Sequence, residues 1–383
     1  MRNNPGVGTQ AGEISTVVVS SKAATQVQVG GSVKDDSVSP VIDLLIPIWQ
    51  RVLQRTSIQV EDSFFELGGN PSLAARLFSE IATASGRHLA PVVIYQAPTI
   101  RALAGILEQG TPVRLPPLVL LKAGTAGPPI FIAPGMGSDV LGLFELVRHI
   151  GVANSIYGMQ PRGTDGVDEP FERIEDMAQF HLAAIKELQP YGPYLLIGYS
   201  LGGLVTLEIA QRLSENGERV ALLAMLDSYP HKRFLRFGQF VRLVARQAKH
   251  HASIAMQLPM RQALSYLTHR SERRSPASRD GGEKLINRPP MSWPFAPTIE
   301  SVRDADDRAL TRYRPRFYRG KINFARAEIS TYFPDDAGAV WADLADEFEL
   351  ETVPGDHRSM LTAHVESLAS VLSRYLREAS DLG

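Results

Sequence analysis

Apolar side chains recur at helical spacing in the first third of the chain. The longest stripe contains Val41, Leu44, Leu45, Ile48, Trp49, Val52 and Leu53. Two shorter stripes follow the turn residues 68–71 and Pro98; they contain Leu73, Leu77 and Ile81, and Ile100, Leu103, Ile106 and Leu107. This periodicity predicts a small helical domain. Pro47 falls inside the longest stripe, so we expect the helix either to be kinked at Pro47 or to begin there.

A different rhythm begins near residue 129, where short apolar runs alternate with amphipathic helical stretches. The runs lie at residues 130–133, 194–197, 220–226, 322–324 and 348–353. Mostly apolar strands separated by helices are typical of a largely parallel sheet with helices on both faces, so we expect an α/β fold. No clear strand is visible from about residue 229 to 312. An insertion of this size favours a lid, which we place at about residues 230–312.

Composition along the chain suggests where these parts begin and end. Residues 1–37 have no apolar period and few large apolar side chains, so we interpret them as a disordered leader. Gly, Thr and Pro gather between residues 110 and 117, which is typical of a linker. We therefore expect a helical domain at residues 38–109, a linker and domain entry at 110–128, and the α/β domain at 129–378.

Overall composition narrows the classes of function. The chain has 383 residues, 44% of them hydrophobic, and a formal net charge of -1, so its balance favours neither nucleic acid nor an anionic membrane as a partner. It contains no cysteine, which excludes disulfides, thiolate metal sites and cysteine nucleophiles, and we predict no metal site. The N-terminus lacks a signal-peptide pattern and no run reaches the ~18 apolar residues of a membrane span, so we expect a cytoplasmic protein.

The strongest chemical motif is the pentapeptide Gly198–Gly202, which reads GYSLG. It follows the apolar run 194–197 and opens a helical stretch, as expected for the G-x-S-x-G turn that carries a nucleophilic serine. Such a turn lifts the hydroxyl of Ser200 above the sheet and next to helix-end amides that favour negative charge. The motif predicts Ser200 as a catalytic nucleophile.

A serine nucleophile needs a base and an orienting acid, and this fold supplies them in the order Ser, Asp, His. Asp227 follows the apolar run 220–226, and His357 follows the run 348–353 through a Pro-Gly-Asp turn. Asp356 lies too close to the histidine to orient it, so we interpret it as a turn residue. The other histidines considered fit less well, because they lie in a helical stretch or in the lid; they are His181, His231, His250, His251 and His269. We predict a Ser200, His357 and Asp227 triad that forms an acyl-enzyme.

The oxyanion of such a reaction needs two hydrogen-bond donors. One is expected to be the backbone amide of Leu201, directly after the nucleophile. The second is expected from the loop Pro134–Gly137, whose glycines allow a substrate to approach the backbone closely. We favour the amide of Gly135, with that of Met136 next.

Four segments carry a resemblance to a known family: PIFIAPGMG at residues 129–137, GYSLGG at 198–203, LDSYP at 226–230 and GDHRSML at 355–361. With these, residues 129 to about 376 resemble the type I thioesterase domains that end nonribosomal peptide and polyketide assembly lines. The resemblance implies an α/β-hydrolase fold with a helical lid. It also implies transfer of an acyl chain from a carrier-bound thioester to the serine, followed by release to water, an internal nucleophile or another acceptor.

Residues 40 to about 109 resemble the phosphopantetheine carrier domains of the same assembly lines, through DSFFELGGN at residues 62–70 and the flanking helices. The resemblance implies an all-α four-helix domain whose cofactor, 4'-phosphopantetheine, is bound covalently to a serine at the start of the second helix. A gapless comparison puts Pro71 at that position and leaves Ser72 one residue late. Two interpretations stay open: Ser72 carries the arm, shifted by ~100° around the helix axis, or Asn70 and Pro71 merely start a helix and the domain carries nothing.

The resemblance also suggests partners and alternatives. The expected partners are acyl- or peptidyl-carrier domains, upstream synthase modules and, if the carrier is active, a phosphopantetheinyl transferase. Basic residues recur between residues 232 and 274, which is consistent with a solvated helix face or with a surface that steers an acidic carrier. Two other functions remain open: a docking module whose carrier domain cannot be modified, and an esterase of the same fold acting on free substrates.

Overall fold

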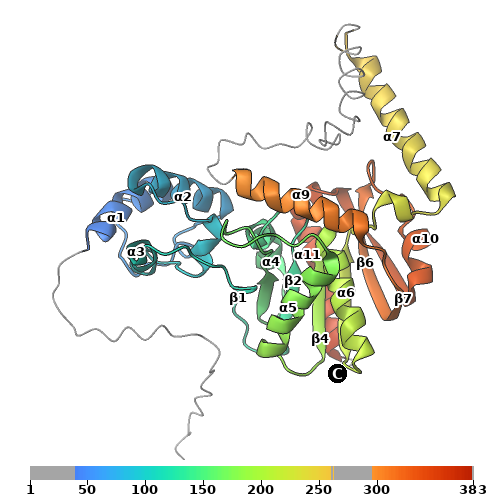
Figure 1. The fold of residues 1–383 in the computed structure, drawn as a ribbon, viewed down its shortest axis with the longest axis horizontal. Helices are drawn as coiled ribbons and strands as arrows, with labels where there is room; N and C mark the ends of the chain where they lie inside the picture. The colour runs from blue at the N-terminus through green and yellow to red at the C-terminus, as the bar shows by residue number, and fades with distance from the viewer. Residues whose placement is uncertain (1–38, 260–261, 263–295, 382–383) are drawn as a thin grey trace, which may run out of the picture. The chain divides into compact units, whose positions relative to one another are not determined.

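The computed structural model describes residues 39–259, 262 and 296–381. Its first part is helical, with α1 (Pro40–Leu53), α2 (Pro71–Ser85), the 3₁₀ helix η1 (Pro91–Tyr95) and α3 (Ile100–Gln109) (Figure 1). The three apolar stripes are thus confirmed as helices, and the fourth helical element is the short η1. Helix α1 begins at Pro40 and continues through Pro47. The interpretation that this helix begins at Pro47 was therefore wrong, since Ser39 caps it about two turns earlier.

The core of this helical part is apolar. Trp49 and Phe64 are fully buried, and their rings meet edge to face with centroids 5.5 Å apart. Within described residues 39–109, no charged, amide or hydroxyl side chain of Asp, Glu, Lys, Arg, His, Asn, Gln, Ser or Thr is buried. A Cβ at Gly69 would lie 2.3 Å from the Phe64 ring, so this position accepts only glycine next to the packed aromatic ring.

The second part is built on a seven-stranded sheet. The strands are β1 (Leu118–Lys122), β2 (Ile130–Ala133), β3 (Ile156–Met159), β4 (Tyr194–Tyr199), β5 (Val220–Leu226), β6 (Tyr318–Ile329) and β7 (Ala345–Asp356), in the spatial order β1-β3-β2-β4-β5-β6-β7. Strand β1 is antiparallel to β3, and the other neighbours are parallel. The predicted, largely parallel sheet is confirmed. The carboxyl ends of the parallel strands, all except β1, lie at one edge of it.

Helices cover both faces of the sheet (Figure 1). One apolar cluster joins alternate strand residues such as Phe131 to α5 (Ile174–Leu188) and α6 (Leu201–Glu215). A second joins the intervening residues, among them Ile130 and Ile132, to α4 (Phe144–His149) and α11 (Val365–Asp381). Because neighbouring residues of a strand face opposite sides, a fully apolar run serves both layers.

Two strands were not predicted. Strand β3 has only four residues, and β1 lies within the segment interpreted as linker and domain entry. Short helices connect the main elements: η2 (Val140–Leu143), η3 (Lys232–Phe234), α10 (Ala337–Trp341), η4 (Ala342–Leu344) and η5 (Ser359–Leu361). The apolar cluster of the helical part also includes Val119, Val140 and Leu141 of the second part.

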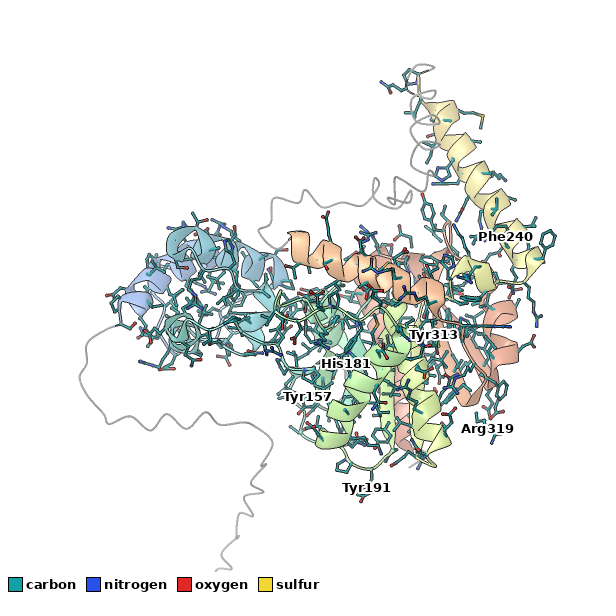
Figure 2. All side chains as sticks on the ribbon, viewed as in Figure 1. Tyr157, His181, Tyr191, Phe240, Tyr313 and Arg319 are labelled. Carbon is teal, nitrogen blue, oxygen red and sulfur yellow. The ribbon has the colours of Figure 1, made fainter. Side chains whose placement is uncertain are left out.

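The predicted lid segment contains two long helices in its described residues, α7 (Phe237–Gln257) and α9 (Ala296–Arg312). Much of α7 is exposed, including Phe237 at 83% and part of Phe240, which Figure 2 labels. Within residues 232–259, Arg236 forms an ion pair with Asp343, and Arg246 forms one with Asp335. The predicted leader lies outside the described residues, and so do Arg261, His269, Arg270 and Arg273.

Candidate active site

Ser200 lies on a strained turn between β4 and α6. Its φ is +54° and its ψ is −119°, a backbone region that non-glycine residues rarely adopt. Its amide donates to the carbonyl of Leu226 on the neighbouring strand at 2.9 Å. Cβ atoms at Gly198 and Gly202 would lie 2.3 Å and 2.4 Å from backbone oxygens, which explains both glycines of the motif. The turn therefore holds the serine side chain at the carboxyl edge of the sheet.

The structure brings Ser200, His357 and Asp227 into one hydrogen-bonded line. Nε2 of His357 lies 3.1 Å from Oγ of Ser200, and its Nδ1 lies 2.8 Å from Oδ2 of Asp227. With the proton on Nδ1, the ring donates to the carboxylate and leaves the Nε2 lone pair facing the serine hydroxyl. The three residues follow β4, β7 and β5, so the common edge of the sheet brings them together from distant parts of the chain.

The carboxylate of Asp227 is almost fully buried, with 1% of the residue exposed. Besides the imidazole it accepts a hydrogen bond from the amide of Ala327 at 3.2 Å, and its own amide donates to the carbonyl of Ala325 at 2.8 Å. Like Ser200, Asp227 has a positive φ, at +44°. A buried carboxylate requires such donors, and here the amide of Ala327 holds Oδ1 while Oδ2 faces the imidazole.

The imidazole of His357 is held between two aromatic rings. Tyr199 stacks on it with centroids 4.8 Å apart, and Phe333 lies 4.5 Å away on centroids. The hydroxyl of Tyr199 also donates to the carbonyl of His357 at 2.5 Å. Asp356 accepts from the amides of Arg358 and Ser359 and does not orient the ring. It therefore has the geometry of the turn residue that was predicted, and these hydrogen bonds lower its pKa.

The expected oxyanion donors lie around the same edge. A Cβ at Gly135 would be 3.2 Å from Cβ of Ser200, so the backbone of this loop passes directly beside the serine. Leu201 is the first residue of α6, where backbone amides lack partners within the helix. Met136 is partly buried against the core. The amide of Gly137 is already used, since it donates to Oδ2 of Asp306 on α9 at 2.8 Å.

Beside the oxyanion loop lies a pocket lined by Gly135, Leu201, Asp306 and His181, among other residues. Burial raises the pKa of Asp306 to about 7, although the hydrogen bond from Gly137 opposes this. Burial lowers the pKa of His181 to about 4, so this ring is neutral near pH 7. A larger hollow of about 470 Å³ lies between α5 and α6, and its lining contains none of these residues.

Several residues of the site were not predicted. Tyr199 occupies the variable position before the serine in the motif, and an aromatic residue there was the one available signal. Phe333, Ala327 and Asp306 lie outside any recognised motif and reach the site only through the fold. Of the competing histidines, His181 is buried on α5 (Figure 2), His231 caps the start of η3, and His250 and His251 lie in α7.

The usual attachment position at the start of α2 has no side-chain hydroxyl. Asn70 caps the helix by accepting from the amide of Leu73 at 3.0 Å, and Pro71 is the first helical residue. Proline has no side-chain hydroxyl, so the position expected for phosphopantetheine does not fit it. Ser72 is exposed in the first turn. Among the described residues, no group of three or more acidic or histidine side chains is arranged to hold a metal ion.

None of the helices in the described residues combines the length and apolar character of a membrane span.

Residues 129–279 match the family model of the thioesterase domain, and residues 43–107 match that of the phosphopantetheine attachment site. The chain is 37% identical over 194 residues to a dimodular nonribosomal peptide synthase of Bacillus subtilis (strain 168), covering 50% of this chain and 8% of that protein. It is also 37% identical over 180 residues to the indigoidine synthase of Streptomyces lavendulae, covering 47% of this chain and 14% of that protein.

The aligned regions thus span a small part of these much longer relatives. Among solved structures, the fold is similar to that of a four-domain nonribosomal peptide synthetase crystallised in its holo form with AMP and glycine. The TM-score is 0.53 and the identity 23%, covering 90% of this chain and 27% of the other. These matches identify a thioesterase domain preceded by a phosphopantetheine carrier-like domain, the pair predicted from the sequence.

Proposed function

We propose that the chain is a serine thioesterase that releases or transfers acyl or peptidyl groups from phosphopantetheine carriers in secondary-metabolite biosynthesis. The observation that carries this proposal is the hydrogen-bonded line from Ser200 through His357 to Asp227. The thioesterase match and the peptide synthetase relatives support the choice of a thioester substrate. The partners we propose are carrier domains and upstream synthase modules.

In the first half-reaction, Oγ of Ser200 attacks the thioester carbonyl carbon while Nε2 of His357 takes the hydroxyl proton. A carbon–oxygen bond forms, and the tetrahedral intermediate then expels the thiolate as the carbon–sulfur bond breaks. The proton held by the imidazole passes to the departing sulfur, which leaves as a thiol. Asp227 remains ionised, keeps the proton on Nδ1 and stabilises the imidazolium that forms in between.

In the second half-reaction, an acceptor attacks the acyl-serine ester. His357 removes a proton from the acceptor, either water or a nucleophile of the acyl chain itself, and returns it to Oγ of Ser200. The ester bond breaks and the serine is regenerated. In both halves, the negative charge on the carbonyl oxygen is met by the amide of Leu201 and by that of Gly135, with the amide of Met136 as the second choice for the latter.

Intact-protein mass spectrometry with a serine-directed fluorophosphonate tests the nucleophile. We expect one added phosphonyl group on the wild type and none on Ser200→Ala, because an unactivated surface serine does not react with this reagent. The labelled peptide should contain residue 200. Labelling of Ser200→Ala to the wild-type extent would contradict the proposal.

A docking module is the second candidate, and Pro71 at the attachment position favours it. In this case the carrier-like domain binds a synthase without carrying an acyl group. Incubating the whole chain with coenzyme A and a phosphopantetheinyl transferase, followed by mass spectrometry, distinguishes the two. An added arm that disappears in Ser72→Ala would support a modified carrier; an unmodified chain that still binds its synthase would support docking.

An esterase on free substrates is the third candidate. Comparing kcat/KM for an acyl pantetheine thioester, the same acyl group on a carrier, and a matched oxygen ester tests it. We expect the carrier-bound thioester to be turned over best. If part of this preference comes from the basic residues of the lid, it should fall as ionic strength rises. Equal turnover of all three at every salt concentration would favour the esterase.

A further inference from the structure

The pocket beside the oxyanion loop contains buried polar groups that the proposed reaction does not use. Gly135 and Leu201 form part of its wall, so the pocket opens next to the serine-bearing turn. Asp306, on α9, and His181, on α5, line the same pocket. They are 6% and 5% exposed, so both reach it from within the packed structure.

Both buried groups present hydrogen-bond acceptors. Nδ1 of His181 is buried and has no partner among the described residues, while the hydrogen bond of this ring to the carbonyl of Pro117 leaves Nδ1 as the acceptor. The carboxyl of Asp306 accepts one hydrogen bond, from Gly137, and forms no ion pair within the part of the chain that the structure describes. Buried acceptors of this kind are costly unless a donor meets them.

Arg162, the one Lys or Arg among the lining residues of the pocket, already has partners. Its guanidinium lies 5.0 Å from the ring centroid of Phe171 and 3.8 Å from Asp168. The remaining wall is largely apolar, with Met159, Met177 and Val205. The cavity volume is about 40 Å³, far below the ~300–1,000 Å³ of pockets that take drug-sized ligands. The pocket therefore suits one small donor group and not a peptide chain.

We propose that this pocket is an acyl-selecting subsite, which takes a short acyl group whose ammonium lies within a few bonds of the thioester carbonyl. The carboxylate of Asp306 and Nδ1 of His181 would accept from this ammonium, and the apolar wall would pack against the intervening methylene groups. The inference rests on the proposed function, because it assigns the acyl class that reaches Ser200. A short distance to the carbonyl follows from the shared wall at Gly135 and Leu201.

Matched pantetheine thioesters test the subsite. The 3-aminopropanoyl and butanoyl thioesters have the same chain length and differ in an ammonium against a methyl group. We expect the wild type to prefer the amine in kcat/KM, and Asp306→Asn to lower this preference by roughly tenfold to a hundredfold, the worth of a hydrogen bond to a charged group. The ratio of kcat/KM for the two thioesters is compared between the wild type and Asp306→Asn, so the different intrinsic reactivity of the two thioesters cancels.

A matched control variant separates selection from structure. Asp306→Asn keeps an oxygen that can accept from the amide of Gly137, so the oxyanion loop retains its tie. Asp307→Asn makes the same charge change one residue along α9, where the side chain is exposed, and it should leave the ratio unchanged. Equal loss of both substrates in Asp306→Asn would overturn the subsite, since it would show only a positioning role for the loop.

Binding to Ser200→Ala gives a readout without turnover. Calorimetry with the intact thioesters should show the same preference for the amine, and Asp306→Asn should remove it. If binding shows the preference but the wild type does not hydrolyse either thioester, the subsite stands and the proposed function fails. If both thioesters are hydrolysed and bound equally well, the function stands and the subsite is refuted.

Discussion

Two helices of this chain begin after a glycine-containing turn, and their first residues differ in what they can do. Helix α6 starts at a serine with a φ of +54° that faces the imidazole of His357. Helix α2 starts at Asn70, whose side chain closes back on the amide of Leu73, followed by Pro71. At α6 the residue that starts the helix has a strained backbone and presents a hydroxyl. At α2 that residue is an ordinary cap, and the first helical residue after it has no hydroxyl.

The contrast shows that a helix start becomes a chemical site only through its neighbours. At both starts the first backbone amides have no carbonyl partner within the helix, and the helix end favours negative charge. At α6 the strands β5 and β7 add a carboxylate and an imidazole, while at α2 the helix supplies only its own cap. The same contrast extends to the interiors, because Asp306 and His181 are buried near α6, and the core around α2 is apolar.

The largest effect should come from removing the hydroxyl at the α6 start. Ser200→Ala should lower kcat for an acyl pantetheine thioester by roughly 10⁶-fold, as expected for a nucleophile that acts together with its base. Steady-state hydrolysis measured by thiol release checks this, with circular dichroism as the control for folding. A loss of kcat of less than tenfold would show that Ser200 is not the nucleophile, and the two helix starts would then not differ in function.

Asp227→Asn should lower kcat by roughly 10⁴-fold, because an amide cannot keep the proton on Nδ1 of His357 or stabilise the imidazolium. Asp356→Asn is the matched control, since that carboxylate accepts only from backbone amides and Ser359. It should change kcat by less than about threefold. Similar losses in both variants would mean that the wrong aspartate has been assigned.

The α2 start should become a carrier site when its hydroxyl is supplied. Pro71→Ser in a Ser72→Ala background should gain the mass of one phosphopantetheine arm after treatment with coenzyme A and a transferase, because the added hydroxyl would stand at a helix N-terminus, where backbone amides favour a phosphate group. Intact-protein mass spectrometry measures the modified fraction. No gain of mass would show that α2 lacks more than a hydroxyl.

The buried imidazole of His181 should make the thioesterase part sensitive to acid. Its pKa is lowered from 6.5 to about 4, so between these values the unfolded chain binds more protons and stability falls as the pH falls. Urea unfolding followed by tryptophan fluorescence measures the free energy of unfolding at pH 7 and at pH 4.5. The difference in this free energy between the two pH values should be roughly 2 kcal/mol smaller in His181→Phe than in the wild type. An unchanged difference would contradict a neutral buried ring.

The smallest effects should have opposite signs at the two helix starts. Ser200→Gly should raise the free energy of unfolding by about 1 kcal/mol, because glycine adopts the positive φ without strain. Asn70→Ala should lower it by about 1 kcal/mol through loss of the cap. Denaturant titration of both variants measures the two changes. Destabilisation by Ser200→Gly would show that the turn is not strained.

Much of the fold was predictable because local chemistry restricts it. The long apolar runs gave β4 and β5, and the helical stripes gave α1, α2 and α3. Strand β3 was missed, since the four residues from Ile156 to Met159 include a glycine and form no recognisable period. Of the two alternatives at Pro47, the helix start was wrong, because packing of α1 tolerates a proline that propensity alone disfavours.

The residues of the site also divide into those that the sequence predicts and those that it does not. Ser200, Asp227 and His357 could be proposed from sequence because each follows a predicted strand in a fixed chain order. Asp306 could not, since it meets Gly137 across 169 residues and belongs to no motif. Such contacts depend on where α9 packs, and a single sequence does not specify the packing of an insertion.

The hydroxyl of Tyr199 ends on the carbonyl of His357, and its ring lies on the imidazole. The side chain before Ser200 thus holds the loop that carries His357. Anyone grafting a foreign histidine loop at residues 354–364 onto this scaffold would need to choose a donor that pairs with a phenol at position 199. A graft that ignores this fastening would keep every reactive group and still misplace the base.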